Sequence, residues 1–120
     1  KGSAFIDNAM IVGENQKIAA AIIVPDFDTL HFWAAKHKIH YTDNDDLVDN
    51  SLVIKRIQKE INKINADLAD YEQIKKIKVI ADIWSTQTGE LSQTLKLKRN
   101  VLQKKYEAVC REFYGAKEEN

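Results

Sequence analysis

The chain has 120 residues and a formal net charge of zero, with 44% hydrophobic and 30% charged side chains, four glycines and one proline. This length suits one folded domain over residues 1–120, and the composition excludes a disordered tail. The single cysteine, Cys110, excludes an internal disulfide and favours a location in the cytoplasm. Because no apolar run is long enough to span a membrane, we expect any association with a membrane to be peripheral.

The first predicted elements are two strands. Residues 9–12 and 18–24 form short runs rich in Ile, Val and Ala, and the segment Gly-Glu-Asn-Gln between them contains residues that tight turns favour. This pattern predicts a β-hairpin. Because both runs are almost continuously apolar, we expect both faces of the hairpin to be covered, or one face to be closed by a partner surface.

A helix is predicted next, over residues 27–37. Pro25 ends the second strand, and Asp26 is suited to cap the helix N-terminus. The apolar face of this helix combines Leu30, Trp33 and Ala34. That face is expected to pack on the sheet.

An acidic segment follows this helix. Thr42, with Asp45 three residues later, predicts a capped turn. One of three residues is expected to cap the next helix: Asp49, Asn50 or Ser51. We expect the aspartates of this segment to interact with helix N-termini rather than with a metal, because the glycine and the spacing of a calcium-binding loop are missing.

Residues 52–68 show the clearest helical pattern in the chain. Apolar residues recur there at intervals of three and four: Ile54, Ile57, Ile61, Ile64 and Leu68. Charged residues fill the opposite side, so we predict an amphipathic helix. The stripe covers only about two and a half heptads, which favours packing on the domain's own sheet over a coiled coil. A purely structural, oligomerising role for the chain is an alternative built on the same stripe.

The last predicted elements are a strand, a loop and a helix. Residues 74–80 alternate between apolar residues and lysines, with a slip near Lys75, and predict a half-exposed third strand. A polar loop follows Trp84. The final helix is expected to bury Val101, Leu102, Tyr106, Val109 and Phe113. This order predicts an α+β domain in which a sheet of about three strands packs against three to four helices.

Several residues that often carry chemistry have no suitable pattern here. The three histidines, at positions 31, 37 and 40, lack the spacing of a zinc site, and we expect no metal site. Cys110 falls on the inner side of the last helix and is expected to be a packed thiol rather than a nucleophile. The chain contains neither a Walker-type phosphate loop nor a dinucleotide fingerprint, so it does not have the motifs of a complete nucleotide-binding enzyme.

Positive charge is concentrated between Lys75 and Lys105. Eight Lys and Arg residues stand there against Asp82 and Glu90, a local balance of plus six. Such a stretch can bind an anion, although a solvated basic face explains the charge equally well. Within it, segment 89–99 brings three cations to a helix N-terminus, where the helix dipole disfavours them, and this favours an anionic partner.

Segment 89–99 reads Gly-Glu-Leu-Ser-Gln-Thr-Leu-Lys-Leu-Lys-Arg. It resembles the last signature motif of the acyl-adenylate-forming enzymes in the form found in long-chain acyl-CoA synthetases, Gly-Glu-Leu-Thr-Pro-Thr-Leu-Lys-Leu-Lys-Arg. The similarity extends to Ala-Met-Ile-Val-Gly-Glu-Asn-Gln-Lys and Ile-Ile-Val-Pro-Asp-Phe near the N-terminus, and to Glu-Gln-Ile-Lys-Lys-Ile-Lys before Trp84. The resemblance therefore covers nearly the whole chain.

This resemblance implies the C-terminal domain of an AMP-forming long-chain fatty-acid:CoA ligase, which makes acyl-AMP from ATP and a fatty acid and then transfers the acyl group to CoA. It places the catalytic lysine at Lys96, and it makes Lys98 and Arg99 weaker candidates for contacts with the phosphates of ATP or CoA. ATP, Mg²⁺ and the fatty acid would bind mainly to a large N-terminal adenylation domain, the partner of this one. The sequence departs from the family at Gln93, where proline is usual, and it lacks the hinge motif that joins the two domains.

In this family the C-terminal domain rotates after adenylation, which withdraws the lysine and presents another face for thioester formation, including part of the CoA channel. The isolated domain is expected to be inactive. The charge pattern alone also fits a stand-alone module whose basic loop binds an acidic protein or nucleic acid. Nucleic acid is not expected, because the basic stretch lacks interleaved aromatic residues for stacking.

Overall fold

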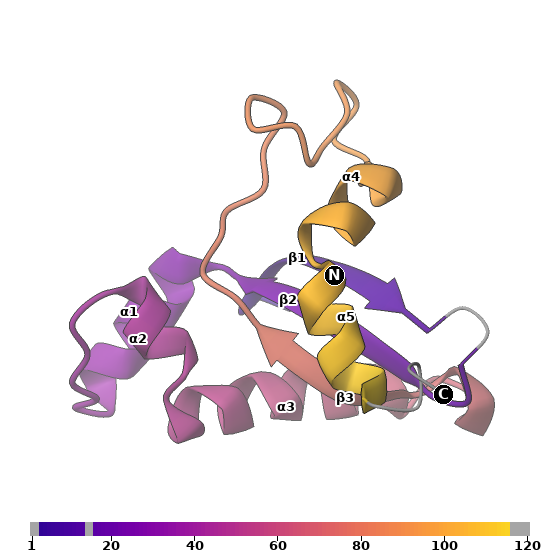
Figure 1. The fold of residues 1–120 in the computed structure, drawn as a ribbon. Coiled ribbons are helices and arrows are strands. Elements are labelled where there is room, and N and C mark those ends of the chain that lie inside the picture. Colours follow the sequence, from indigo (N-terminus) through magenta and orange to yellow (C-terminus); the bar gives the residue numbers. More distant parts are fainter. Residues whose placement is uncertain (1–2, 14–15, 116–120) are drawn as a thin grey trace.

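A computed structural model describes residues 3–13 and 16–115, which form a sheet with helices on both faces (Figure 1). In chain order the elements are β1 Ile6–Val12, β2 Ala19–Pro25, α1 Phe27–Lys36, α2 Asn44–Val48, α3 Ser51–Asn65, the 3-10 turn η1 Asp70–Glu72, β3 Ile74–Val79, α4 Arg99–Lys105 and α5 Glu107–Tyr114. The predicted α+β class and the three-stranded sheet are confirmed. Within the described ranges there are five α-helices rather than three or four.

The sheet has the strand order β1-β2-β3. Antiparallel pairing of β1 with β2 confirms the predicted hairpin, although residues 14–15 of its turn lie outside the described residues. β2 and β3 pair in parallel, and the connection between them carries α1, α2 and α3. The slip predicted near Lys75 is a bulge: Ala19 pairs with Ile74, whereas Ala20 pairs with Lys76.

The central strand β2 is buried on both faces. Ala21 and Ile23 belong to the core under α1, α2 and α3, while Ala20 and Ile22 belong to a second core under α4 and α5. This alternation explains the continuous apolar run that the sequence shows. β1 is covered only in part, because Ile11 is 42% exposed.

Two of the predicted helix starts are confirmed. The Asp26 carboxylate accepts a hydrogen bond from the Thr29 N–H at the start of α1 (3.1 Å). Asn50, one of the three candidates, caps α3 by accepting from the Leu52 N–H (2.8 Å). Each side chain satisfies an amide that the helix itself leaves unpaired.

The predicted start of the short acidic turn is wrong by one residue. Asp43, not Thr42, is the N-cap of α2, and its carboxylate accepts from the Asp46 N–H (2.9 Å). Asp46 in turn accepts from the Thr42 N–H (3.0 Å). Aspartate can occupy the N-cap of α2 because its side chain caps a helix at least as well as that of threonine.

The apolar stripe of α3 is shorter and slightly rotated from the prediction. Ile57 and Ile61 are buried, but Ile54 is 38% exposed and Val53 is buried instead. α3 ends at Asn65 because this side chain pairs with the first residue of β3: its amide donates to the Ile74 carbonyl (2.9 Å) and its oxygen accepts from the Ile74 N–H (2.8 Å).

The single final helix that the sequence predicts is two helices, α4 and α5, which meet at Tyr106. Leu102, Tyr106 and Phe113 are buried as expected, and Val109 is partly buried. Val101 is 39% exposed, so its predicted place on the inner face is wrong. The chain bends at Tyr106, whose backbone lies at φ −109°, and the bend breaks the helical periodicity used to assign the inner face.

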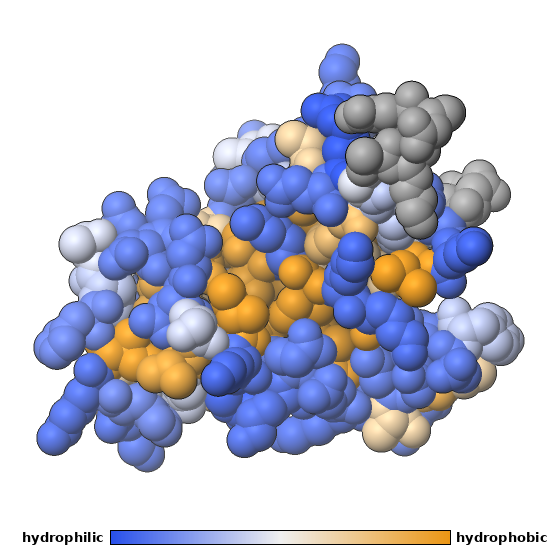
Figure 2. Space-filling model, turned by 60° about the horizontal axis from the view of Figure 1, so that its bottom comes forward, coloured by the Kyte–Doolittle hydropathy of each residue, from blue (hydrophilic) through white to orange (hydrophobic). Residues whose placement is uncertain are grey.

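The surface is uneven in polarity. Figure 2 shows apolar surface across the middle of one face, framed by hydrophilic side chains. Among the described residues, no helix is both long enough and apolar enough to cross a membrane.

Candidate active site

The segment between β3 and α4 carries the residues that the sequence motif singles out. It leaves the sheet after Val79, passes through the buried Trp84 and rises away from the sheet before α4 begins at Arg99 (Figure 1). We call residues 85–98 the lysine loop. As predicted, it contains no regular helix or strand.

The outer part of the lysine loop is a small hairpin over residues 91–97. Leu91 and Leu97 form an isolated antiparallel bridge, and the Ser92 N–H donates to the Lys96 carbonyl (2.8 Å). The Leu95 N–H closes a β-turn by donating to the Ser92 carbonyl (2.8 Å). The Ser92 hydroxyl oxygen accepts from the Lys96 N–H (3.2 Å). These bonds fix the backbone on both sides of Lys96.

Leu95, directly before Lys96, has a strained backbone. Its φ of 64° lies in the left-handed region, which favours glycine, and its side chain is 67% exposed. A left-handed residue commonly follows the turn in a three-residue hairpin loop. The turn therefore imposes this conformation on Leu95, and its hydrogen bonds offset the strain.

The inner part of the loop is organised by Glu90, which is only 2% exposed. Its carboxylate accepts from the Lys105 ammonium of α4 (2.7 Å), from the Thr88 hydroxyl (2.5 Å) and from the Ser85 N–H (3.2 Å). Its backbone carbonyl accepts from the Lys98 N–H (2.8 Å). Glu90 thus contacts the start of the loop, the end of the hairpin and α4.

The carboxyl group of Glu90 is held in its charged form. Burial by itself would raise its pKa, but the ammonium of Lys105, the Thr88 hydroxyl and the Ser85 N–H together outweigh burial and lower the pKa to about 2. Glu90 is therefore ionised throughout the neutral and mildly acidic pH range.

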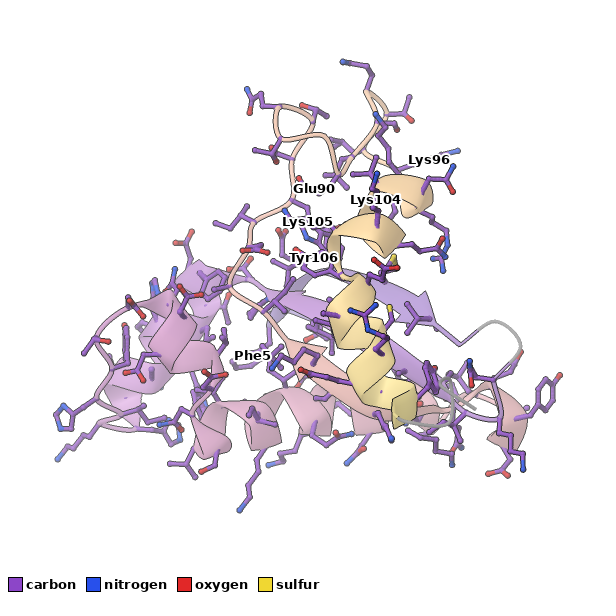
Figure 3. The ribbon with its side chains drawn as sticks, in the orientation of Figure 1. Phe5, Glu90, Lys96, Lys104, Lys105 and Tyr106 are labelled. Atoms are coloured by element: carbon purple, nitrogen blue, oxygen red, sulfur yellow. The ribbon has the colours of Figure 1, made fainter. Side chains whose placement is uncertain are left out.

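A second polar group lies beneath this ion pair. The Tyr106 hydroxyl donates to the Asp82 carboxylate (2.7 Å) and accepts from the Trp84 indole N–H (2.9 Å). Lys105 also lies 4.0 Å from the same Asp82 oxygen. Burial, together with the nearby Asp82, raises the pKa of Tyr106, so its hydroxyl stays protonated and remains a donor. Figure 3 shows Glu90 beside Lys105, with Tyr106 below them and Lys96 above.

The three cations of the motif have different environments. Lys96 and Lys98 are exposed, and no hydrogen bond or ion pair involves either ammonium group within residues 3–13 and 16–115. Arg99 instead donates to the Ile11 carbonyl of β1 (2.7 Å). The structure thus presents two accessible ammonium groups at the loop and ties the third cation to the sheet.

Gln93 occupies the second position of the turn over Ser92–Leu95 and is exposed. Proline is well suited to this position of the common β-turns, because its fixed φ matches the turn. The hydrogen bond that closes the turn is donated by Leu95 and not by residue 93. Glutamine at this position therefore forms the turn without the fixed φ that proline would supply.

Sequence reasoning missed the pairing of Glu90 with Lys105, because it treated both residues only as part of a charge balance. One signal was present: Glu90 is the only acidic residue of the lysine loop. A single acid among neutral polar residues and nearby lysines is suited to form a specific ion pair.

No group of three or more His, Cys, Asp or Glu side chains in the described part of the chain is placed to hold a metal ion. His31 hydrogen-bonds the Asn44 side chain (2.7 Å), and His37 hydrogen-bonds the Trp33 carbonyl (2.9 Å).

The sequence of this chain was compared with family models and with curated proteins, and both comparisons match the same kind of domain. A family model described as "AMP-binding enzyme C-terminal domain" matches residues 1–118. Long-chain-fatty-acid–CoA ligase 6 of Homo sapiens is 34% identical over 96 residues, which are 78% of this chain and 14% of the ligase. Long chain acyl-CoA synthetase 8 of Arabidopsis thaliana is 24% identical over 116 residues, which are 94% of this chain and 16% of the synthetase. The chain spans less than a fifth of the length of these curated relatives.

Solved structures share the fold. The adenylation domain of a carboxylate reductase from Mycobacterium chelonae superposes with a TM-score of 0.65 at 23% identity, covering 94% of this chain and 16% of that domain. The A-PCP didomain of a carboxylic acid reductase from Segniliparus rugosus, in complex with AMP, gives a TM-score of 0.67 at 19% identity, covering 94% of this chain and 14% of the didomain. At these identities the likeness establishes the fold alone.

Proposed function

The chain belongs to the family of AMP-binding enzyme C-terminal domains, and we propose that it is the mobile C-terminal domain of a long-chain fatty-acid:CoA ligase, to which it supplies Lys96 as the adenylation lysine. The observation that carries this proposal is the placement of Lys96. Its ammonium is exposed on a loop that projects from the domain, while hydrogen bonds hold the backbone on both sides of it. The side chain can reach a partner without the loop having to fold first.

The first half-reaction explains why a lysine is suited to this place. A carboxylate oxygen of the fatty acid attacks the α-phosphorus of ATP, a new P–O bond forms, and the bond to pyrophosphate breaks. Two anions approach each other and negative charge grows on the phosphoryl oxygens. A cation held between them lowers the barrier electrostatically, and the compact charge of lysine on a flexible stem can enter and leave such a site.

The second half-reaction has different needs. The CoA thiol loses its proton, the thiolate sulfur attacks the acyl carbonyl, a C–S bond forms, and AMP leaves with the electrons of the broken C–O bond. We propose that the domain rotates before this step, withdraws Lys96 and presents another face as part of the CoA channel. Lys98 and Arg99 are the candidates for phosphate contacts, and the bond of Arg99 to Ile11 leaves other guanidinium donors for such a contact.

The choice of a long-chain fatty acid is supported by two curated relatives, which are by name a long chain acyl-CoA synthetase and a long-chain-fatty-acid–CoA ligase. The acyl tunnel, the adenine pocket and the Mg²⁺ ligands are proposed to lie in an N-terminal adenylation domain. The proposal also places the enzyme in the cytoplasm, with any membrane contact peripheral.

The proposal predicts that activity requires both domains. The complete enzyme, given ATP, Mg²⁺, palmitate and CoA, should release AMP and form palmitoyl-CoA, whereas this 120-residue chain alone should form neither product. The measurement is chromatography of AMP and acyl-CoA after incubation with each protein. AMP release by the chain alone would place the active site within these residues, and failure of the complete enzyme with every fatty acid tested would exclude the ligase.

A further inference from the structure

Glu90 joins three segments that are otherwise separate. Its carboxylate accepts from Ser85 and Thr88 at the start of the lysine loop, and from Lys105 in α4. Its carbonyl accepts from the Lys98 N–H, where the hairpin ends and α4 begins. Both the side chain and the backbone of Glu90 therefore hold the loop against the helix.

The hairpin that carries Lys96 begins directly after this junction. Leu91, the next residue, bridges Leu97, and the Ser92 N–H donates to the Lys96 carbonyl (2.8 Å). Glu90 is therefore one of the contacts that fix the position of Lys96 relative to the domain. Leu91 is buried and anchors the same base, whereas residues 93–96 are exposed.

We propose that Glu90 is a positioning residue for Lys96: the ion pair between the buried Glu90 carboxylate and the partly exposed Lys105 ammonium clamps the hairpin 91–97 to α4, so that the lysine is presented in one orientation. This inference rests on the proposed function of Lys96. Glu90 touches no reacting atom in this scheme, since it acts through the hairpin backbone.

The surroundings of the pair favour a clamp over a chance surface contact. The Glu90 side chain is 3% exposed, and both of its carboxylate oxygens accept hydrogen bonds. The Lys105 ammonium also lies 4.0 Å from a carboxylate oxygen of Asp82, which accepts a hydrogen bond from the Tyr106 hydroxyl (2.7 Å). Charge-assisted hydrogen bonds to a buried carboxylate are among the stronger polar interactions, whereas exposed ion pairs contribute little.

The first test measures the clamp itself by amide hydrogen exchange in this chain. In Glu90→Gln, the Ser92 and Lys98 amides, which donate the bonds that close the hairpin, should exchange about ten- to a hundredfold faster. The Ile80 amide, which donates to the Ile23 carbonyl in the sheet, should keep its rate. Glu107→Gln, the same change at an exposed ion pair of α5, should alter none of these rates.

A second pair of variants covers the case in which Glu90→Gln unfolds the domain and accelerates all amides. Lys105→Met removes the ammonium, which also lies 4.0 Å from Asp82, and leaves Glu90 with its bonds from Thr88 and Ser85. Glu90→Asp keeps the charge but shortens its reach. Each should accelerate the hairpin amides selectively, with Lys105→Met having the larger effect. Unchanged hairpin amides in a folded Glu90→Gln or Lys105→Met protein would overturn the clamp.

The second test asks whether the clamp serves the chemistry of the complete enzyme. Glu90→Gln should slow acyl-adenylate formation by about ten- to a hundredfold and leave thioester formation from preformed acyl-adenylate unchanged. The double variant Glu90→Gln/Lys105→Met should form acyl-adenylate little more slowly than Glu90→Gln alone, because both substitutions break the same interaction. A purely structural role would lower both half-reactions together, and that result would overturn the positioning role.

The two tests separate this inference from the proposed function. If Lys96→Ala leaves adenylation intact, the proposed function fails, while hydrogen exchange still decides whether Glu90 clamps the hairpin. If Lys96→Ala abolishes adenylation but Glu90→Gln does not slow it, the positioning role alone fails.

Discussion

A carboxylate on a polar loop is usually solvated. The Glu90 carboxylate is buried, and hydrogen-bond donors of the protein surround it. Three donors replace the water that the group loses: an ammonium, a hydroxyl and a backbone amide. The pKa falls to about 2 because these donors outweigh the cost of burial. The charge of Glu90 is thus itself part of the stability of the loop.

The first prediction at this scale is a loss of stability in acid that depends on Glu90. The pKa of this group is about 2 in the folded chain against 4.5 as its ordinary value, so its stabilisation is complete above about pH 5 and is lost as the pH falls toward 2. The loss is at most about 3 kcal/mol, and less where water screens the partly exposed Lys105. Urea unfolding at pH 6 and pH 2.5 measures it.

Glu90→Gln is the control for this pH dependence, since it removes the titrating group and should make the difference in stability between pH 6 and pH 2.5 smaller. Glu60, whose pKa is lowered chiefly by the Ser3 hydroxyl and also by Arg56 and Lys63, contributes equally to both proteins. Equal pH dependence in the two proteins would show that Glu90 does not carry a depressed pKa.

The second prediction at this scale concerns Gly13, which has a φ of 132°. A Cβ atom there would lie 2.9 Å from both the Ile18 carbonyl oxygen and the Tyr114 hydroxyl, which hydrogen-bond each other (3.0 Å). Gly13→Ala should therefore destabilise the fold through backbone strain of about 1–3 kcal/mol and through the close contacts by roughly as much again.

Gly89→Ala is the matched control for Gly13→Ala. Gly89 also has a positive φ, 95°, but no atom lies within 4 Å of a Cβ built there. Gly89→Ala should introduce backbone strain but no close contacts. The loss of free energy of unfolding, measured with urea, should therefore be larger for Gly13→Ala. Equal losses would mean that Tyr114 and the turn can move aside.

At the scale of elements, the lysine loop shows how a segment without regular structure keeps a defined shape. Its inner part is held by Glu90, and its outer part by a β-turn and a two-residue bridge. The backbone of Leu95 has a left-handed conformation, with a φ of 64°, which the turn requires. The loop can therefore project from the domain and still present Lys96 from a fixed backbone.

The prediction for this element is that Gln93→Pro stabilises it. Proline at the second turn position restricts the unfolded chain without removing the bond that Leu95 donates, which should raise the free energy of unfolding by about 0.4–1 kcal/mol. Thr94→Pro is the control, because proline at the third position disfavours the turn and should destabilise it. Thermal unfolding of both variants measures the difference, and a loss of stability in Gln93→Pro would contradict this account of the turn.

The elements that the sequence predicts well are those set by local signals. The apolar run of β2, the Asp26 cap and the alternation of β3 all depend on near neighbours, and the structure confirms them. The break between α4 and α5 was missed because it occurs at Tyr106, whose side chain is held by Trp84 and Asp82, more than 20 residues away. The misplacement of Val101 follows from that break.

In the candidate site, too, the features set by local sequence could be predicted and those set by distant contacts could not. The motif places Lys96 on a loop before a helix, and the structure has it there. Neither the burial of Glu90 nor the tie between Arg99 and Ile11 could be predicted, because each needs a partner that only the folded chain brings near. Local pattern thus predicts which residue is exposed, and tertiary contacts decide how it is held.

At the scale of the whole molecule, the two cores on either side of the sheet make the described domain suited to move as one body. α4 and α5 pack on one face of β2, Arg99 is tied to β1, and Lys105 is tied to the lysine loop. A rotation of the domain would therefore carry Lys96 with it. The proposed two-step mechanism with one mobile domain requires such rigidity.

The measurement that tests this account most directly separates the two half-reactions in the complete enzyme. Pyrophosphate exchange follows acyl-adenylate formation, and thioester formation from added acyl-adenylate and CoA follows the second step. Lys96→Ala should slow exchange by about two to three powers of ten and spare the second step, whereas Lys98→Ala should keep exchange within roughly tenfold. Equal impairment of both steps in a folded Lys96→Ala enzyme, or loss of exchange in Lys98→Ala instead, would contradict the assignment of Lys96.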